Sequence, residues 1–303
     1  MDLRLLEYFL ESARQESINK AAEVIHISQP TLSRQLAQLE EQLGVQLFVR
    51  GNKGIKLTNE GVLFKRRAQE ILDLVGKTED ELRSQEQELE GTITIGCGET
   101  KAVARLAELI KGFQREHPLV RFDLITGNAD ASQEGMDRGL IDIGLLLEPV
   151  NMSKYEFIRL PDPDPWVVIL RSDDPLARKR FVTAADLYKR NLIFPSRISI
   201  QSELAHWFNG RYEKLHIIAT SNLSTNSSIL VKQGLGISLA IAGSLPDRDQ
   251  QILTYRPLKP ALSTYSVICW KRDVPVSRLV EAFINYLKRK LTDSSFSNGK
   301  RER

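Results

Sequence analysis

The side chains with the clearest chemical potential lie close together between residues 29 and 38. Gln29, Thr31, Ser33, Arg34 and Gln38 are small or hydrogen-bonding, without the glutamate–lysine mixture usual on a solvated helix. Such groups can pair with base edges in the DNA major groove, where each base pair presents its own pattern of donors and acceptors. Their spacing therefore favours a helix that reads DNA.

Two short amphipathic helices would position these residues. Apolar residues recur at i, i+3, i+4 and i+7 and then at i, i+4, i+7 and i+11, which predicts one buried face on each helix. The two sets are Ile18, Ala21, Ala22 and Ile25, followed by Leu32, Leu36, Leu39 and Leu43. Between them Ser28 can cap the second helix, and Pro30, counted here among the DNA contacts, fits its first turn. The alternative is a plain helical hairpin with a solvated turn.

A basic turn follows the second helix in the segment RGNKGIKLT. Its glycines and asparagine predict a tight connection between two short extended arms. It carries three cations, namely Arg50, Lys53 and Lys56. Only two acids, Glu40 and Glu41, occur between residues 24 and 59. We expect a hairpin that holds the phosphates flanking the groove and supplies affinity rather than sequence reading.

Composition sets limits without identifying the function. The chain has 303 residues, enough for two domains, and its formal net charge of +3 does not by itself indicate a nucleic-acid partner. No basic start followed by an apolar run, and no run of about 18 apolar residues, is found, so we expect a cytoplasmic protein without membrane association. Cys97 and Cys269 have no metal-binding spacing and suit free thiols in a reducing compartment.

The stretch from residue 59 to residue 90 predicts a long helix. Apolar and polar positions alternate in steps of four and three, as in a coiled-coil seam. The positions are Phe64, Ala68, Ile71, Val75, Thr78, Leu82, Gln85 and Leu89. We expect this helix to dimerise the protein, which would let two reading helices reach two half-sites. The alternative is a surface helix that packs only within its own subunit.

From Gly91 onward strands and helices alternate, which favours parallel sheets built from βαβ units. A proline-rich crossover at Pro161–Pro165 and a second near Ala261–Tyr265 divide this region into two α/β lobes. Ligands of such domains bind where strand ends and helix starts face a cleft. The tail after Leu291 is polar, and we expect it to be disordered.

The first 65 residues resemble LysR-type transcriptional regulators. The resemblance is carried by Ala21-Ala22, Ser28-Gln29-Pro30, Leu32-Ser33, Leu39-Glu40, Leu43-Gly44, Leu47-Phe48, Arg50, Leu57-Thr58 and Gly61. The remainder resembles the family through length and element order. The resemblance implies an N-terminal, all-α winged helix-turn-helix, a dimerising linker helix and a two-lobed α/β effector domain like periplasmic binding proteins. It also implies a homodimer or homotetramer that binds double-stranded promoter or operator DNA and a small-molecule effector, with RNA polymerase as a further partner.

On this basis we expect a DNA-binding domain at residues 1–58, a linker helix at 59–90 and an effector domain at 91–292. Lobe one would comprise residues 91–161 and 266–292, and lobe two residues 162–265, with a disordered tail at 293–303. By resemblance, small polar residues at the strand–helix junctions contact the effector. The expected contacts are Thr100, Asn128, Ser196 and Thr225, with the charged Glu99 and Arg197 beside them.

Glu99 departs from the family pattern, because an acid at the mouth of a cleft would oppose a simple anionic effector. It could pair with Arg197 or face a cationic or amino-bearing ligand. The alternative for each cleft residue is a plain helix cap or turn. Either outcome leaves the cleft itself as the expected effector site.

The sequence contains few features that would indicate an enzyme. The segment Gly96-x-Gly98 follows a predicted strand, but Lys101 breaks the dinucleotide pattern GxGxxG. The histidines, at positions 26, 117, 206 and 216, are isolated and lack zinc-ligand spacing. We therefore expect no catalytic residues, no metal and no cofactor. A plain small-molecule-binding protein is a further alternative, disfavoured by the helix-turn-helix. The sequence predicts an effector-responsive transcriptional regulator.

Overall fold

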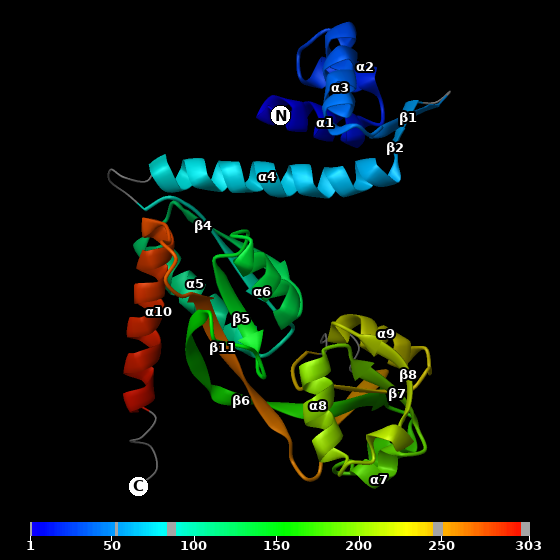
Figure 1. The fold of residues 1–303 in the computed structure, drawn as a ribbon. Coiled ribbons are helices and arrows are strands. Elements are labelled where there is room, and N and C mark those ends of the chain that lie inside the picture. Colours follow the sequence, from blue (N-terminus) through cyan, green and yellow to red (C-terminus); the bar gives the residue numbers. More distant parts are fainter. Residues whose placement is uncertain (1, 52–53, 84–88, 245–250, 298–303) are drawn as a thin grey trace. The chain divides into compact units, whose positions relative to one another are not determined.

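The structure is a computed structural model that describes residues 2–51, 54–83, 89–244 and 251–297 (Figure 1). The chain divides into two compact units, residues 1–83 and residues 84–303. The first unit contains the predicted reading helices and the second contains the predicted lobes.

The first unit is built from four helices and one hairpin. Its elements are α1 (Leu3–Gln15), α2 (Ile18–Val24), α3 (Gln29–Leu43), β1 (Phe48–Gly51), β2 (Gly54–Leu57) and α4 (Asn59–Arg83). The predicted Ser28 cap is present, because its hydroxyl accepts the N–H of Thr31 (3.3 Å). At the other end, Gly44 terminates α3 with φ of 69°. The apolar stripes of α2 and α3 pack in one core with Phe9 of α1, which is fully buried. Leu43 is the exception, because it lies outside this core and is 37% exposed.

The hairpin β1–β2 pairs Phe48 with Leu57 and Gly51 with Gly54 in antiparallel register. Glu40, on α3, holds the start of β1, because its carboxylate accepts the N–H groups of Leu47 (2.6 Å) and Phe48 (3.0 Å). One of the two acids in this basic segment is therefore a structural acceptor. The expected extended arms are confirmed.

The predicted coiled-coil seam is not one continuous face of α4. Ala68 is buried in the core of the first unit, with Phe64 and Ile71 packed against the same core. Leu89, at the far end of the seam, packs against a core of the second unit. The alternative of packing within the subunit therefore holds for these four positions. Gln85 lies outside the described residues. Among the side chains of α4 that the structure describes, which do not include Leu82, the exposed large apolar residues are Val62, Leu63 and Leu74.

The second unit contains one mixed sheet with strand order β4-β3-β5-β11-β6-β9-β7-β8, and β10 also pairs with β6. Its strands are β3 (Gly91–Cys97), β4 (Val120–Thr126), β5 (Ile143–Leu147), β6 (Tyr155–Arg171), β7 (Asn191–Pro195), β8 (His216–Ser221), β9 (Ile237–Ile241), β10 (Leu253–Pro257) and β11 (Ser263–Lys271). The outer strands of each lobe are parallel, as predicted. The central pairs β5–β11, β11–β6 and β6–β9 are antiparallel, which the sequence did not predict.

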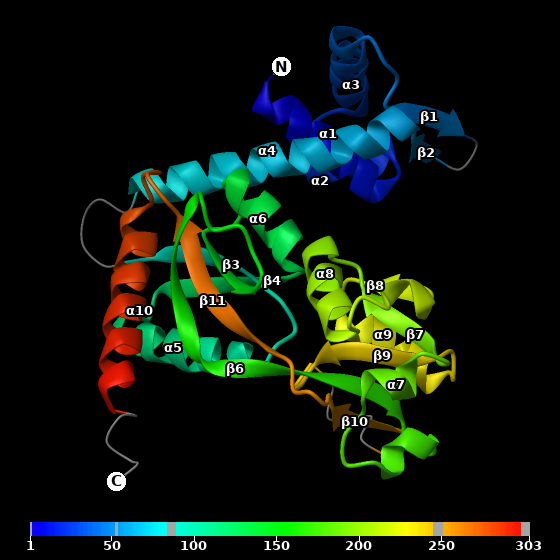
Figure 2. The same ribbon diagram turned by 60° about the horizontal axis from the view of Figure 1, so that its bottom comes forward.

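The expected proline-rich crossover is a continuous part of β6, which runs beside β11 from one lobe to the other (Figures 1 and 2). The N–H of Trp166 donates to the carbonyl of Leu262 (2.8 Å), and the carbonyl of Pro165 accepts from Ala242 (2.8 Å) on the opposite edge. N–H groups at even positions therefore face the β11 side. The prolines occupy only odd positions, so they remove no donor from the β6–β11 ladder.

Helices cover both faces of the sheet in each lobe. They are α5 (Ala102–Glu116), α6 (Ala129–Asp137), α7 (Ala184–Leu187), α8 (Ile198–Trp207), α9 (Ser224–Lys232) and α10 (Arg278–Ser297), with short 3-10 turns at Pro175–Arg178 and Tyr212–Lys214. In lobe one α5 and α10 share one core and α6 packs on the other face. In lobe two α8 and α9 divide the faces in the same way.

The C-terminal helix corrects one boundary. We expected disorder from residue 293, but α10 continues to Ser297 because residues 291–297 carry no glycine or proline that would end a helix. Residues 298–303 lie outside the described residues. Within the described ranges, no helix is both long and apolar enough to cross a membrane.

Candidate DNA-binding surface and effector cleft

The first ten residues of α3 include the predicted reading residues, most of which are exposed to solvent. Gln29, Pro30, Thr31, Arg34 and Gln38 are exposed, and Ser33 is half-buried. The buried positions between them are Leu32, Leu36 and Leu39. Burial at every third or fourth residue thus turns the polar residues outward, as a groove-reading helix requires.

The side chains on this surface differ in how free they are. The Thr31 hydroxyl lies 2.7 Å from the Ser28 hydroxyl, so the cap already occupies part of its hydrogen-bonding capacity. Arg34 has no hydrogen-bond or ion-pair partner among the described residues. A guanidinium without an internal partner can bind a base edge or a phosphate without breaking a contact.

The hairpin places two of the three predicted phosphate-binding cations. Arg50 lies on β1 opposite Ile55, and Lys56 lies on β2 opposite Val49. Lys56 and Val49 are both exposed. Lys53 lies outside the described residues.

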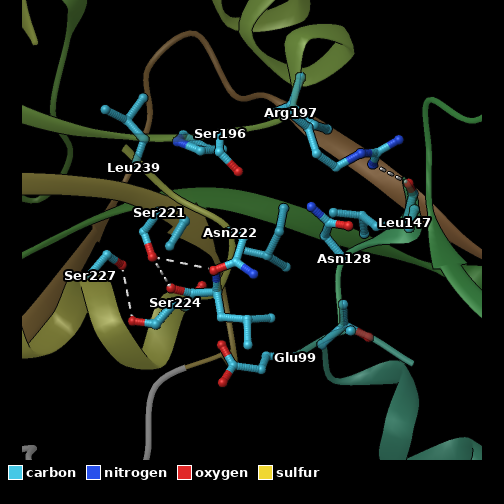
Figure 3. A pocket seen from close by; sticks show the side chains of 18 of the residues that line it. Glu99, Asn128, Leu147, Ser196, Arg197, Ser221, Asn222, Ser224, Ser227 and Leu239 are labelled. Atoms are coloured by element: carbon cyan, nitrogen blue, oxygen red, sulfur yellow. Dashed lines mark hydrogen bonds between the residues drawn. The ribbon is translucent and has the colours of Figure 1, made fainter. Parts of the chain in front are cut away.

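In the second unit, a cavity of about 100 Å³ opens between the two lobes (Figure 3). Five of the six predicted effector residues line it, and these are Glu99, Thr100, Asn128, Ser196 and Arg197. The Thr100 hydroxyl also accepts from Ala102 (3.2 Å), and Asn128 caps α6 through Ala131 (2.9 Å). Cap and cavity-lining roles therefore coexist in these two residues.

Arg197 joins the lobes through three contacts. From the start of α8 its Nε donates to Asp130 (3.0 Å), and its two terminal nitrogens donate to the carbonyls of Leu147 (3.1 Å) and Pro149 (2.8 Å). The Arg197 side chain is only 8% exposed, whereas Asp130 is 63% exposed. The guanidinium is thus buried and fully engaged by lobe one, and the contact with Leu147 is visible in Figure 3.

Glu99 joins the lobes at a second point. Its carboxylate accepts the backbone N–H of Thr225 (3.0 Å) and also the Thr225 hydroxyl. Thr225 does not itself line the cavity. Of the two alternatives for Glu99, the pairing with Arg197 is wrong, because each side chain is bound to a different partner across the cleft.

The strands that connect the lobes also contain a buried acid. Asp164 of β6 is 3% exposed and accepts a hydrogen bond from the Ser266 hydroxyl of β11 (2.6 Å). Burial raises the pKa of this carboxyl, while Ser266 and Lys101 act in the opposite direction. Within the described residues, no group of three histidine, cysteine, aspartate or glutamate side chains could hold a metal ion.

Family models match both units of the chain. The bacterial regulatory helix-turn-helix of the lysR family matches residues 3–62, and the LysR substrate binding domain matches residues 86–292. The chain belongs to the LysR family. It is a DNA-binding transcriptional regulator with an effector-binding domain, and not an enzyme, which confirms the function and fold class predicted from the sequence.

Relatives of known name cover nearly all of this LysR-family protein. The Hca operon transcriptional activator HcaR of Escherichia coli is 29% identical over 276 residues, covering 90% of this chain and 92% of HcaR. The regulator YtlI of Bacillus subtilis is 30% identical over 258 residues, covering 84% and 82% of the two chains. The crystal structure of CbnR, a LysR family regulator, is 21% identical, covers 96% of this chain and 99% of CbnR, and superposes with a TM-score of 0.71. CbnR has also been crystallised in complex with its target DNA.

The cleft of this LysR-family protein contains residues that sequence reasoning missed. Trp166 lines the cavity and is 3% exposed, yet its indole N–H has no hydrogen-bond partner in the described structure. Ser227 and Ser238 also line the cavity and are buried. Ser238 interrupts the apolar strand β9, and a polar residue inside a buried strand was the one signal available for it.

Proposed function

We propose that this LysR-family protein reads operator DNA with the exposed face of α3 and holds the flanking phosphates with its hairpin. Gln29, Thr31, Ser33 and Arg34 would lie in the major groove, with Pro30 and Gln38 at its edges. Arg50, Lys53 and Lys56 would bind the backbone. The observation that carries the proposal is Arg34, which is exposed and has no partner among the described residues, on a helix whose other face is buried.

The effector would bind in the cavity between the lobes. A ligand shifts a conformational equilibrium only if it binds one arrangement better than the other. Here Glu99 and Arg197 each connect the lobes beside the cavity, so a ligand that changes lobe separation would alter these contacts. We propose that this change controls the activity of the regulator at promoters, with RNA polymerase as the responding partner.

We further propose that the protein acts in the cytoplasm as a homodimer or homotetramer. Val62, Leu63 and Leu74 support an interface on α4, because they are large apolar side chains exposed on one long helix. The proposed interface therefore uses these exposed residues instead of the predicted seam. The first half of that seam packs within the subunit. Two copies would present two α3 helices to paired half-sites.

The test is DNA binding by an Arg34→Ala variant. Titrations with DNA from upstream of the protein's own gene should show sequence-dependent binding by the wild type at moderate salt. Loss of one base-contacting arginine should weaken specific binding by about ten- to a hundredfold, corresponding to about 1–3 kcal/mol, and leave the urea unfolding curve unchanged. Arg14→Ala is the control, because it removes the same charge from an exposed site on α1 that pairs with Glu11.

Equal weakening by the two substitutions would show a bulk charge effect and remove Arg34 from the contact surface. Absence of any sequence-dependent binding by the wild type would contradict the proposed reading of operator DNA.

A further inference from the structure

The two lobes of the second unit contact each other on two sides of the cavity, and the contacts differ in their exposure to water. On the first, the Arg197 side, a guanidinium of lobe two donates to Asp130 and to two backbone carbonyls of lobe one, and these contacts are partly buried. On the second, the Glu99 side, a carboxylate of lobe one accepts the N–H (3.0 Å) and the hydroxyl of Thr225, and these contacts are exposed. Figure 3 labels both charged side chains, which lie at different parts of the cavity wall. The two sides should therefore not open with equal ease.

The Glu99 side has a second contact, made by Lys101 from the same turn between β3 and α5. Gly243 of lobe two lies just beyond β9 and has φ of 87°. The stem of Lys101 packs so closely on this glycine that a methyl group there would collide with it. Both residues are exposed. The β3–α5 turn thus holds lobe two at two points, Thr225 and Gly243.

The Arg197 side is held more firmly, because its acceptors are fixed to a strand that connects the lobes. Two of these acceptors are the carbonyls of Leu147 and Pro149. Between them, the N–H of Glu148 donates to the carbonyl of Tyr265 on β11 (2.9 Å), and the carbonyl of Glu148 accepts from the hydroxyl of Thr264 (2.8 Å). The segment that binds the guanidinium is therefore anchored on both faces.

Breaking the contacts on the two sides should have different free-energy costs. On the Glu99 side, the separated groups return to water, which replaces the lost hydrogen bonds at a small net cost. On the Arg197 side, the guanidinium is 8% exposed, and separation would leave a buried charge without its partners. The contacts of Glu99 should therefore break first.

We propose that the cleft opens on the Glu99 side, with the β3–α5 turn as a releasable clip and the Arg197 side as the fixed end of the movement. The consequence for regulation rests on the proposed effector role of the cleft: an effector would pass the clip, and its affinity would depend on how firmly the clip holds. The movement itself involves only groups of this chain, so it can be tested without an effector.

Hydrogen exchange of the Thr225 amide tests the clip directly. Thr225 is the second residue of α9, so its N–H has no acceptor within the helix and is protected by Glu99. In the full-length protein, Glu99→Ala should speed this exchange about five- to tenfold, because a hydrogen bond to a charged acceptor is lost. Glu99→Gln keeps a neutral acceptor and should give an intermediate rate. Glu108→Ala, which removes an exposed acid from α5, is the control.

Gly243→Ala tests the second contact of the clip. The added methyl group should displace the stem of Lys101 and speed exchange of the Thr225 amide, by a smaller factor than Glu99→Ala does. Gly234→Ala is the matched control, because Gly234 has φ of 81° and an added methyl group there would meet no further atom of the described residues within 4 Å. In a Lys101→Ala background, Gly243→Ala should act no more strongly than Gly234→Ala.

Distances between spin labels show which side opens. One pair, at Ala104 and Asn226, spans the Glu99 side from α5 to α9. A second pair, at Glu134 and Ser202, spans the Arg197 side from α6 to α8, and all four positions are exposed. The native cysteines are buried and should not react, and dilution with unlabelled chains removes distances between subunits. Glu99→Ala should lengthen and broaden the first distance and leave the second unchanged.

Unchanged exchange of the Thr225 amide in Glu99→Ala and Glu99→Gln would overturn the proposal, because Glu99 would then not hold lobe two. Equal lengthening of both spin-label distances, or of neither, would overturn it as well, because the Arg197 side would not be the fixed end. An effect of Gly243→Ala no larger than that of Gly234→Ala would exclude Lys101 from the clip. DNA binding by the wild type is measured separately, so a failure of the clip is distinguishable from a failure of the proposed regulator function.

Discussion

The reading face of α3 and the cleft between the lobes use charge in opposite ways. On α3 the guanidinium of Arg34 is exposed and has no partner among the described residues. In the cleft the guanidinium of Arg197 is 8% exposed and bonded at all three nitrogens. The guanidinium donors can therefore bind a ligand on α3, whereas in the cleft they are already used by other groups of the protein.

The difference fits what each surface is proposed to bind. DNA carries a dense negative charge, and an exposed cation is solvated by water until it binds the phosphates and displaces their counterions. Such a cation needs no partner within the protein. A buried cation without partners would be far costlier, because desolvation penalises an isolated charge by several kcal/mol. The cleft can therefore keep Arg197 only by pairing it, which makes the residue a connector between lobes rather than a free ligand-binding group.

Among the substitutions proposed here, Arg197→Ala should produce the largest loss in the free energy of unfolding. A small loss would contradict the view that this buried arginine is kept in place by its partners. The substitution leaves the carbonyls of Leu147 and Pro149 without their donor and should destabilise the second unit by about 2–4 kcal/mol. Arg34→Ala should change stability by less than about 0.5 kcal/mol. Urea unfolding followed by tryptophan fluorescence reports the second unit, since all three tryptophans, at positions 166, 207 and 270, lie in it. Circular dichroism of the same samples also reports the first unit, which contains Arg34.

Equal stability of the two arginine variants would mean that the buried contacts of Arg197 contribute no net stability. Arg197→Lys sharpens the test, because an ammonium group cannot reproduce the planar, three-nitrogen contact. Its loss of stability should lie between those of the wild type and the alanine variant.

The two regions also differ in how far the sequence predicted them. The α3 face depends on local periodicity within about ten residues, so Leu32, Leu36 and Leu39 were enough to orient Arg34 outward. The cleft depends on contacts between residues far apart in the chain. The bond from Thr225 to Glu99 spans 126 residues, and that from Arg197 to Asp130 spans 67. The sequence placed both charged residues at the cleft but could not show which partner each would choose.

Helix α4 and the proline-rich part of β6 show the same limit. Alternating steps of four and three in α4 are satisfied equally by a partner subunit or by the helix's own domain. In the structure Phe64, Ala68 and Ile71 pack against the core that contains Phe9. Proline was likewise an ambiguous signal at residues 161–165, because its effect on a strand depends on which edge its missing N–H faces.

Glu40→Ala tests whether the first unit also contains a charged side chain whose hydrogen bonds stabilise the fold. The loss of stability should be smaller than that caused by Arg197→Ala. The carboxylate accepts two backbone N–H groups where β1 begins. Its loss should destabilise the first unit by about 2 kcal/mol, because hydrogen bonds to charged groups contribute more than neutral ones. Glu41→Ala, at the exposed neighbouring position, is the control and should be neutral within about 0.5 kcal/mol.

Circular dichroism during urea unfolding reports both units, so a change that tryptophan fluorescence does not show is assigned to the first unit, which contains no tryptophan. Glu40→Ala should also weaken DNA binding if the hairpin must be held in place to grip phosphates. Unchanged stability and unchanged DNA affinity would show that β1 is positioned by its apolar contacts alone. In that case Glu40 would not be the hydrogen-bonded counterpart, within this unit, of the unpaired charge on α3.

Tyr155→Phe gives the smallest effect and is confined to alkaline pH. The side chain is 2% exposed, its hydroxyl donates to Asp137 (3.1 Å), and burial followed by this bond raises its pKa to about 12. The unfolded chain loses this proton near pH 10, while the folded chain retains it. Between about pH 10 and pH 12 the folded state therefore binds more protons, and its stability falls as pH rises.

Phenylalanine cannot titrate, so the variant should lose stability less steeply than the wild type above pH 10, by up to about 1.4 kcal/mol per pH unit. Below pH 10 the two curves should run parallel, offset by the lost hydrogen bond. A decline remains in the variant, because burial also raises the pKa of Cys269 to about 12. Equal slopes of the free energy of unfolding against pH in the wild type and Tyr155→Phe would show that Tyr155 ionises at the same pH in the folded and unfolded states. The hydrogen bond of Tyr155 with Asp137 would then not hold its proton in the folded protein.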